Sequence, residues 1–181
     1  MILVTVERMY VFDDLSTSWE TSEWHDRYPN RKDVVGSCNG ILCICDKFGG
    51  ILLCNLFTRD KQAVPSPRSW CRSDARTFSF THDPTTGRYM VVHVPRYDRV
   101  MVFTLGEAAW REFVIPCYIF LHDNDGFVTI GNMMYWSRWD NKIMSLCLDG
   151  ERAPSVIPLP SSRLAGTWRL TQVVGMAWHR L

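Results

Sequence analysis

Cysteine is the residue type whose clustering in this sequence first suggests chemistry. Three of the seven cysteines, Cys38, Cys43 and Cys45, lie in the segment "DVVGSCNGILCIC". Thiolates bind zinc and act as nucleophiles, so the segment raises two chemical hypotheses, a metal site and a catalytic thiol. A third hypothesis is that these cysteines are small apolar residues in a sheet.

The spacing of the cysteines argues against a metal site. A structural zinc site requires two CxxC-like pairs, or one such pair with two histidines. The sequence has neither, and the other cysteines and the histidines are scattered singly. On an extended strand Cys43 and Cys45 share one face with Ile41, while Leu42 and Ile44 share the other. This alternation favours packing in a sheet, and we expect no metal and no cofactor.

Catalytic motifs are also missing. The segment "VVGSCNG" lacks the second glycine of a GxSxG nucleophile elbow, and no phosphate-binding GxGxxG or Walker loop occurs. No residue beside Cys38 would lower the pKa of its thiol. We therefore predict that the protein is not an enzyme. Asp83, Pro84 and Gly87 are expected to form a turn, with Asp83 accepting backbone hydrogen bonds.

Composition excludes several classes of partner. The chain has 181 residues, 46% of them apolar and 22% charged, and a net charge of +1. This near-neutral charge predicts binding neither to nucleic acid nor to a membrane. An odd number of cysteines without a regular framework favours a reducing compartment, the cytoplasm or the nucleus.

Alternating and β-branched runs predict strands that would position these residues, and no apolar pattern with helical spacing is sustained. Asn39-Gly40 predicts the first tight hairpin. Trp110 and Trp136 fall inside predicted strands and Trp168 immediately precedes one. We assign all three to core or inter-blade packing, with the indole N–H finding a partner at a blade edge. The predicted strands are Ile2–Val6, Met9–Phe12, Ile41–Cys45, Ile51–Leu56, Thr77–Thr81, Tyr89–Val94, Val100–Leu105, Trp110–Ile115, Phe127–Ile130, Met133–Ser137, Lys142–Leu148, Ser155–Ile157 and Arg169–Val174.

The strands recur in units. Three segments each end at a proline, Pro65, Pro116 or Pro158, at intervals of roughly 40 to 50 residues, which is the period of a propeller blade. Each is preceded by another hairpin, so we predict a partial, kelch-like β-propeller of four-stranded antiparallel blades. The units span about 34–65, 77–116 and 127–158, and a fourth begins at 167–181. Residues 1–33 form a separate N-terminal segment that contributes one or two strands before the β domain at 34–181.

Five segments in order carry a family resemblance: "VVGSCNGILCICD", "ILLCNLFTRDKQAVPSPRSW", "FSFTHDPTTGRYMVVHV", "VMVFTLGEAAWREF" and "IMSLCLDGERAPSVIPLP". Over about residues 34–175 they resemble the F-box-associated interaction domain of plant F-box proteins, in the version abundant in grasses. Cys54 and Leu56 stand where that family's "WNPxTrexxxLP" element has tryptophan and proline.

The resemblance implies a non-catalytic module that holds a target protein of unknown identity for ubiquitylation, while an F-box docks on a Skp-type adaptor of a cullin ligase. Residues 1–33 contain no recognisable F-box. We therefore expect a fragment or shortened product, and adaptor binding only if an F-box exists elsewhere. One alternative is a degenerate or decoy member that binds a partner without ligase docking. Another is a propeller-fold enzyme, although no carboxylate pair or ligand set supports it.

Partner binding is expected on one end of the blades. Turns after first and third strands form what we call the turn end. Turns after second strands and the connections between blades form the crossing end. The turn-end segments "SCNG", "TRDK", "DPTTG", "GEAA" and "DGER" contain no aromatic residue, whereas the crossing end is rich in the residue types of interface hot spots. The candidate residues are Arg68, Trp70, Arg72, Arg96, Tyr97, Arg99, Arg138 and Trp139.

Overall fold

The structure, a computed structural model, describes residues 2–4, 9–11, 22–24, 32–46, 50–67, 77–96, 98–116, 119, 127–138, 140, 142–150 and 152–157, with the backbone alone for 2–33 and Arg96. No helix long and apolar enough to span a membrane occurs among these residues. The strands are β1 Ile2–Val4, β2 Met9–Val11, β3 Ser22–Trp24, β4 Lys32–Cys38, β5 Ile41–Asp46, β6 Ile51–Asn55, β7 Lys61–Val64, β8 Phe78–Asp83, β9 Arg88–Arg96, β10 Arg99–Thr104, β11 Arg111–Val114, β12 Phe127–Ile130, β13 Met133–Ser137, β14 Ile143–Cys147 and β15 Ser155–Ile157.

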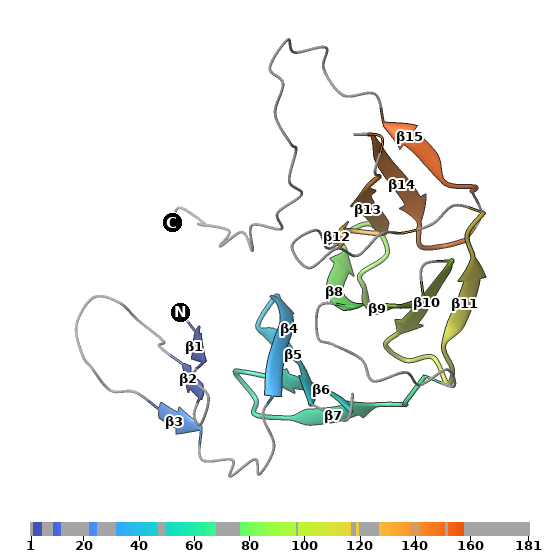
Figure 1. Cartoon of the computed structure of the whole chain (residues 1–181). Coiled ribbons are helices and arrows are strands. Elements are labelled where there is room, and N and C mark those ends of the chain that lie inside the picture. Colours follow the sequence, from blue (N-terminus) through green and yellow to red (C-terminus); the bar gives the residue numbers. More distant parts are fainter. Residues whose placement is uncertain are drawn as a thin grey trace, which may run out of the picture.

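These strands form antiparallel sheets in which each strand pairs with its neighbour in the chain. β4–β7, β8–β11 and β12–β15 make three four-stranded sheets, which we call blades 1, 2 and 3 (Figure 1). The prediction of an all-β fold with four-stranded antiparallel blades is confirmed. β1–β3 make a further three-stranded sheet, so the N-terminal segment supplies three strands in the described part of the chain and not the one or two expected.

Individual strands follow the sequence pattern closely. β12, β13 and β15 have the predicted bounds, whereas β9 extends beyond Tyr89–Val94 at both ends. β3 was not predicted, because "SEW" is short and two of its three residues are polar. β4 and β7 are absent from the predicted strands, although the four-strand repeat implied them. The strand predicted at Arg169–Val174 lies outside the described residues.

The inner strands of the three blades lie next to each other. β4 contacts β8, and β8 contacts β12. The hydroxyl groups of Ser79 and Thr129 lie 2.7 Å apart, and Thr81 Oγ1 donates to the carbonyl oxygen of Gly131 at 3.0 Å. Figure 1 shows the fourth strands, β7, β11 and β15, on the outside of this row. First strands inside and fourth strands outside is the arrangement of propeller blades.

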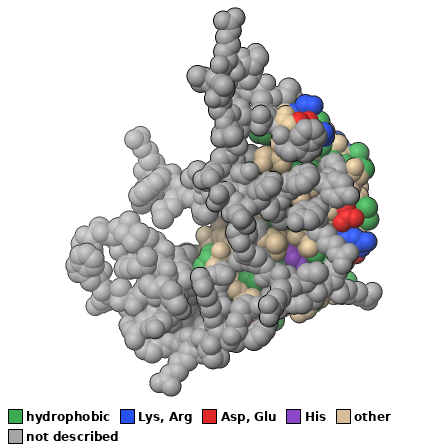
Figure 2. Space-filling view, viewed as in Figure 1, with side chains coloured by type: hydrophobic (Ala, Val, Ile, Leu, Met, Phe, Trp, Pro, Cys, Tyr) green, Lys and Arg blue, Asp and Glu red, His purple; other side chains and the backbone are tan. Residues whose placement is uncertain are grey.

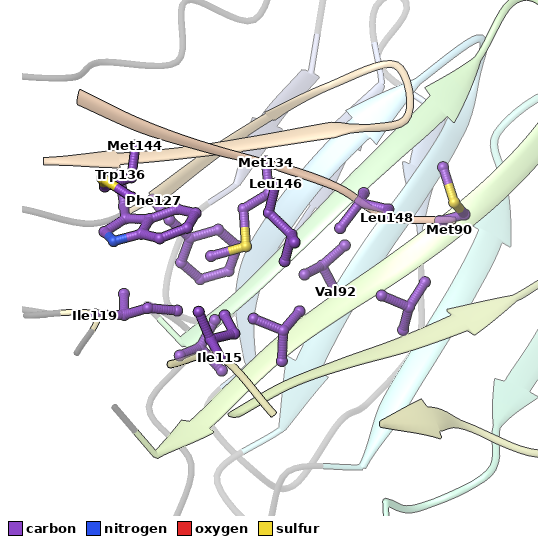
Figure 3. Packing of buried hydrophobic residues seen from close by; sticks show 13 residues of the cluster. Met90, Val92, Ile115, Ile119, Phe127, Met134, Trp136, Met144, Leu146 and Leu148 are labelled. Atoms are coloured by element: carbon purple, nitrogen blue, oxygen red, sulfur yellow. The ribbon is translucent and has the colours of Figure 1, made fainter. Parts of the chain in front are cut away.

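Two apolar cores fill the spaces between blades. The core between blades 2 and 3 contains Trp136, which is fully buried, together with Phe127 and Met144 from neighbouring strands (Figure 3). The core between blades 1 and 2 includes Cys43 and Phe80. Blade sheets therefore bury side chains on both faces, which explains strands such as β5 that have four consecutive buried residues.

Trp110 joins blade 2 to blade 1. Trp110 was predicted to lie inside a strand, but it lies just before β11. Its indole Nε1–H donates to the carbonyl oxygen of Pro65 at 2.6 Å, and its ring lies 5.6 Å from that of Phe103. The assignment of Trp110 and Trp136 to packing between blades is confirmed. The expected hydrogen bond of the indole N–H is present for Trp110 but not for Trp136, whose Nε1–H is buried without a partner among the described residues. Trp168 lies outside the described residues.

The predicted turns are present. Asn39 and Gly40 have φ values of 49° and 77°, the left-handed pair that a two-residue hairpin requires. Asp83 accepts hydrogen bonds from the Thr85 backbone N–H at 2.9 Å and the Thr86 hydroxyl at 2.7 Å. These bonds, that of Thr86 above all, hold the pKa of Asp83 below its usual range. The expected role of Asp83 as a turn acceptor is confirmed.

Candidate partner-binding surfaces

The crossing end is described only in part. Arg99 begins β10 and Arg138 follows β13. Arg96 ends β9, but only its backbone is described. The other candidate residues lie outside the described residues: Arg68, Trp70, Arg72, Tyr97 and Trp139. Their proposed role in partner binding stays a prediction.

The two described arginines of the crossing end are already engaged in ion pairs. Arg99 pairs across the β10–β11 edge with Glu112. Arg138 Nε lies 3.2 Å from Asp140 Oδ1, and Lys142 Nζ lies 3.1 Å from Asp140 Oδ2. Burial opposes ionisation of Asp140, but the Lys142 hydrogen bond and the two cations outweigh it and lower the pKa of Asp140. These arginines therefore have local partners to give up before they could bind a target.

The surface view agrees with this local compensation of charge. Figure 2 shows acidic and basic side chains next to each other along the margin where β11 lies, and the described surface there carries no large region of one sign. A partner selected mainly by charge would find no single-sign patch in this view.

The cysteines of the opening segment are packing residues. Cys43 and Cys45 are buried in the core toward blade 2, whereas Cys54 lies in a separate cluster on the opposite face of blade 1. Burial, with smaller contributions from Cys45 and Cys54, raises the pKa of the Cys43 thiol far above its usual value. Burial also raises the pKa of Cys38. Within the described ranges no group of three His, Cys, Asp or Glu side chains is placed to hold a metal ion.

The turn end carries the most exposed large apolar side chain of the described residues, Phe57. The residue is 82% exposed and lies in the turn between β6 and β7. Asn55 Oδ1 accepts hydrogen bonds from the backbone N–H groups of Phe57 at 2.9 Å and Thr58 at 3.2 Å. The Thr58 hydroxyl in turn donates to Asp60 Oδ2 at 2.6 Å. This turn is fixed by its own polar groups and not by burial of the phenyl ring.

A second turn supports the ring from below. A Cβ atom placed on Gly40 would lie 2.3 Å from Cε2 of Phe57, so the ring lies directly against the glycine backbone. Asn39 Nδ2 donates to the Tyr89 hydroxyl at 3.2 Å, which links this turn to blade 2. The non-glycine residues with positive φ in the described chain are Asn39, at 49°, and Arg59, at 65°. Arg59 closely follows Phe57 in the chain, and Asn39 precedes Gly40 in the hairpin against which the ring lies. The non-glycine residues with this unusual backbone conformation therefore lie in the two segments around Phe57.

The expectation that the turn end lacks aromatic residues is wrong. The predicted strand ended at Leu56 and the predicted turn began at Thr58, in "TRDK". Phe57, which lies between them, was therefore assigned to neither. The available signal was Asn55, because an asparagine at the end of a strand caps a turn through its side-chain oxygen. Ile130, 66% exposed before the turn at Gly131, is a second large apolar residue at this end.

Comparison with known proteins agrees with this architecture. No curated protein matches the chain. The family model described as the KIB1-4 beta-propeller matches residues 10–175, which covers blades 1 to 3 and most of the chain on either side. That family consists of F-box-related plant proteins. Four-stranded antiparallel blades with their first strands side by side are the arrangement of a β-propeller. Because the family model matches most of the chain, the chain belongs to the KIB1-4 beta-propeller family.

Proposed function

We propose that this protein is a non-catalytic protein-interaction module that binds a target protein through the turn end of blade 1. The observation that carries the proposal is Phe57, 82% exposed on a turn held by Asn55 and Gly40. Aromatic residues are enriched at protein interfaces because they bury a large apolar area with few rotatable bonds. A fixed turn adds to this advantage, because little conformational entropy is lost on binding.

The biological setting we propose follows from the family. An F-box-related propeller is suited to hold a target for a Skp–cullin–F-box ubiquitin ligase, in the cytoplasm or the nucleus. The finer assignment, to the grass-type F-box-associated interaction domain, rests on the five sequence segments. Docking on a Skp-type adaptor would require an F-box, which residues 1–33 do not show.

Two alternatives remain distinct from this proposal. A decoy member would bind the same target without the adaptor. A propeller-fold enzyme would need a reactive group, and the described thiols are poor candidates because burial raises the pKa values of Cys38 and Cys43. The exposed Phe57 supports a binding function, in preference to a metal site or a catalytic thiol at the cysteines.

Quantitative recovery of partners tests the proposal. The immobilised chain is incubated with a plant extract, and bound proteins are measured by mass spectrometry against the variants Phe57→Ala and Val114→Ala. Val114 is a matched control because it is 71% exposed on β11, away from this turn. Loss of a hot-spot aromatic ring costs about 2 kcal/mol or more, so recovery of the true target should fall roughly thirtyfold with Phe57→Ala alone.

The same experiment separates the alternatives. A Skp-type adaptor recovered with the target supports a ligase role, and a target recovered without it supports the decoy. Equal recovery of the target by Phe57→Ala and the unmodified chain would reject the turn end as the binding surface. The crossing-end residues would then be the favoured candidates.

A further inference from the structure

The turn that exposes Phe57 also presents an arginine side chain without a local partner. Arg59 is exposed, and its guanidinium has no ion pair or hydrogen bond within the described part of the chain. Its backbone is held, because the Arg59 N–H donates to the carbonyl oxygen of Asn55 at 2.9 Å and its φ is 65°. The turn therefore fixes where the side chain begins, and all the guanidinium donors stay available to a ligand.

The neighbouring carboxylate does not use these donors. Asp60 Oδ2 accepts a hydrogen bond from the Thr58 hydroxyl at 2.6 Å, and the backbone N–H of Asp60 donates back to the Thr58 hydroxyl oxygen at 3.4 Å. This reciprocal pair closes the turn. The segment Phe57–Lys61 reads "FTRDK", with two cations and one carboxylate, so the surroundings of the ring are slightly positive.

Further donors lie on the blade 2 side of the Asn39-Gly40 hairpin. The Tyr89 hydroxyl accepts from Asn39 Nδ2 at 3.2 Å, and its own proton meets no acceptor among the residues that the structure describes. The His82 ring lies against Tyr89 with the ring centres 4.5 Å apart. A hydroxyl that accepts one hydrogen bond can still donate one, and an imidazole ring carries at least one N–H donor. Phe57 therefore lies beside a surface with more donors than acceptors.

The crossing end lacks this combination in its described part. Arg99 is paired with Glu112, and Arg138 is paired with Asp140. A carboxylate from a partner would have to displace an ion pair there, whereas at Arg59 it would displace only water. Charge-assisted hydrogen bonds between guanidinium and carboxylate groups are stronger than those between neutral groups. Charge complementarity therefore favours an anionic group beside the apolar side chain that packs on Phe57.

We propose that the turn end of blade 1 binds an acidic peptide segment of its target, in which an aspartate or glutamate lies close to a large apolar side chain. The apolar side chain packs on the Phe57 ring, and the carboxylate accepts hydrogen bonds from Arg59. The Tyr89 hydroxyl donates to a second acceptor of the same segment. The proposed function is presupposed here, and the chemistry of the partner is added to it.

A carboxylate fits this surface better than a phosphate group does. Domains that recognise phosphorylated segments use clusters of arginine residues. Arg59 is the one arginine in the segment "FTRDK". A single guanidinium can bind one carboxylate through two parallel hydrogen bonds, so it suffices for an aspartate or a glutamate.

A displayed library of random peptides is the probe that tests the proposal. Peptides are selected on the immobilised full chain, and those that Phe57→Ala also retains are removed. The remaining peptides should be enriched in aspartate and glutamate close to an aromatic or aliphatic residue. The most enriched peptide is then synthesised with a fluorophore, and its affinity for each variant is measured by fluorescence anisotropy.

Arg59→Gln should weaken binding of this peptide by about tenfold, because it removes the charged donor without shortening the side chain much. Arg59→Lys should weaken it less, since a point charge remains. Arg152→Gln is the matched control, because Arg152 is an exposed arginine between β14 and β15 on blade 3, and it should leave the affinity unchanged. Replacing the carboxylate of the peptide by an amide should cost the unmodified chain about tenfold and should cost Arg59→Gln nothing further.

The outcomes separate this proposal from the proposed function. Peptides that depend on Phe57 but show no enrichment in acidic residues would overturn the acidic partner and leave the turn end as the binding surface. Equal affinities of Arg59→Gln and Arg152→Gln would do the same. Tighter binding of a peptide with phosphoserine in place of its acidic residue would identify a phosphorylated partner and overturn the proposal. A library that yields no peptide dependent on Phe57 would count against the proposed function itself.

Discussion

Blades 1 and 3 are the end blades of the described array, and their outward faces differ. On blade 1 the face away from blade 2 holds Leu42, Ile44 and Cys54, which are 1%, 6% and 1% exposed. On blade 3 the face away from blade 2 is mixed: Val128 and Ser145 are 7% and 5% exposed, Met133 is half-buried, and Ile130 is 66% exposed. Figure 1 places β1–β3 on the outward side of blade 1, whereas no described strand follows β15.

The difference teaches that these sheets are apolar on both faces regardless of their position in the array. An inner blade is covered by its neighbours, but an end blade depends on the chain before or after it. The stability of the fold should therefore be distributed unevenly. Truncation should cost most at positions buried on a blade face, such as Ile44, and least at exposed positions, such as Ile130.

A matched pair of isoleucines gives the largest expected contrast. Ile44→Ala on blade 1 should lower the free energy of unfolding by about 3 kcal/mol, because it leaves a cavity among buried side chains. Ile130→Ala removes the same atoms from an exposed rim and should cost less than about 1 kcal/mol. Urea denaturation followed by tryptophan fluorescence measures both values. Similar losses for the two variants would show that the end blades are covered alike.

The fold could be predicted from sequence because its signals are local. Alternation marked most strands, and Asn39-Gly40 and Asp83 marked turns whose backbone conformations depend on neighbouring residues only. β3 was missed because Ser22–Trp24 is a short segment without alternation, and only pairing with β2 makes it a strand.

The candidate surfaces were harder to predict, because they depend on which residues meet across strands. Arg99 pairs with Glu112 through the β10–β11 register, which the sequence does not display. Similarly, Phe57 was assigned neither to the strand predicted at Ile51–Leu56 nor to the turn, whereas the Asn55 side chain turns the chain and the ring is exposed. The sequence therefore predicted the blades, but it did not predict which single side chains are exposed or paired.

The pH dependence of stability provides a second test, because a buried histidine resists protonation. His93 is 1% exposed and stacks on Phe78 with the ring centres 4.0 Å apart. Burial lowers the pKa of His93 to about 4, whereas an unfolded histidine has a pKa of about 6.5. Between these values the unfolded chain binds a proton that the folded chain does not, so stability falls as the pH falls. From pH 7.5 to pH 5 the loss should be about 2 kcal/mol.

Urea denaturation at a series of pH values measures this loss. The variant His93→Phe retains an aromatic ring for stacking but cannot titrate, so its stability should change less over the same window. A slope that is unchanged in His93→Phe would assign the pH dependence to other groups.

Alanine substitutions at two glycine turns should have the smallest effects on stability, and they should differ in their effect on target binding. Gly40 and Gly87 have φ values of +77° and +71°, so alanine is strained at both and should cost roughly 1 kcal/mol. They differ in their surroundings, because a Cβ at Gly40 would lie 2.3 Å from Phe57 whereas nothing lies within 4 Å of one at Gly87. The exposed ring can swing aside, so Gly40→Ala should lose little more stability than Gly87→Ala. Its target affinity should nevertheless fall by about three- to tenfold, because the ring is no longer held ready for binding. Equal affinities of the two variants in a titration with the recovered target would mean that Phe57 acts through its area alone, without help from the turn that supports it.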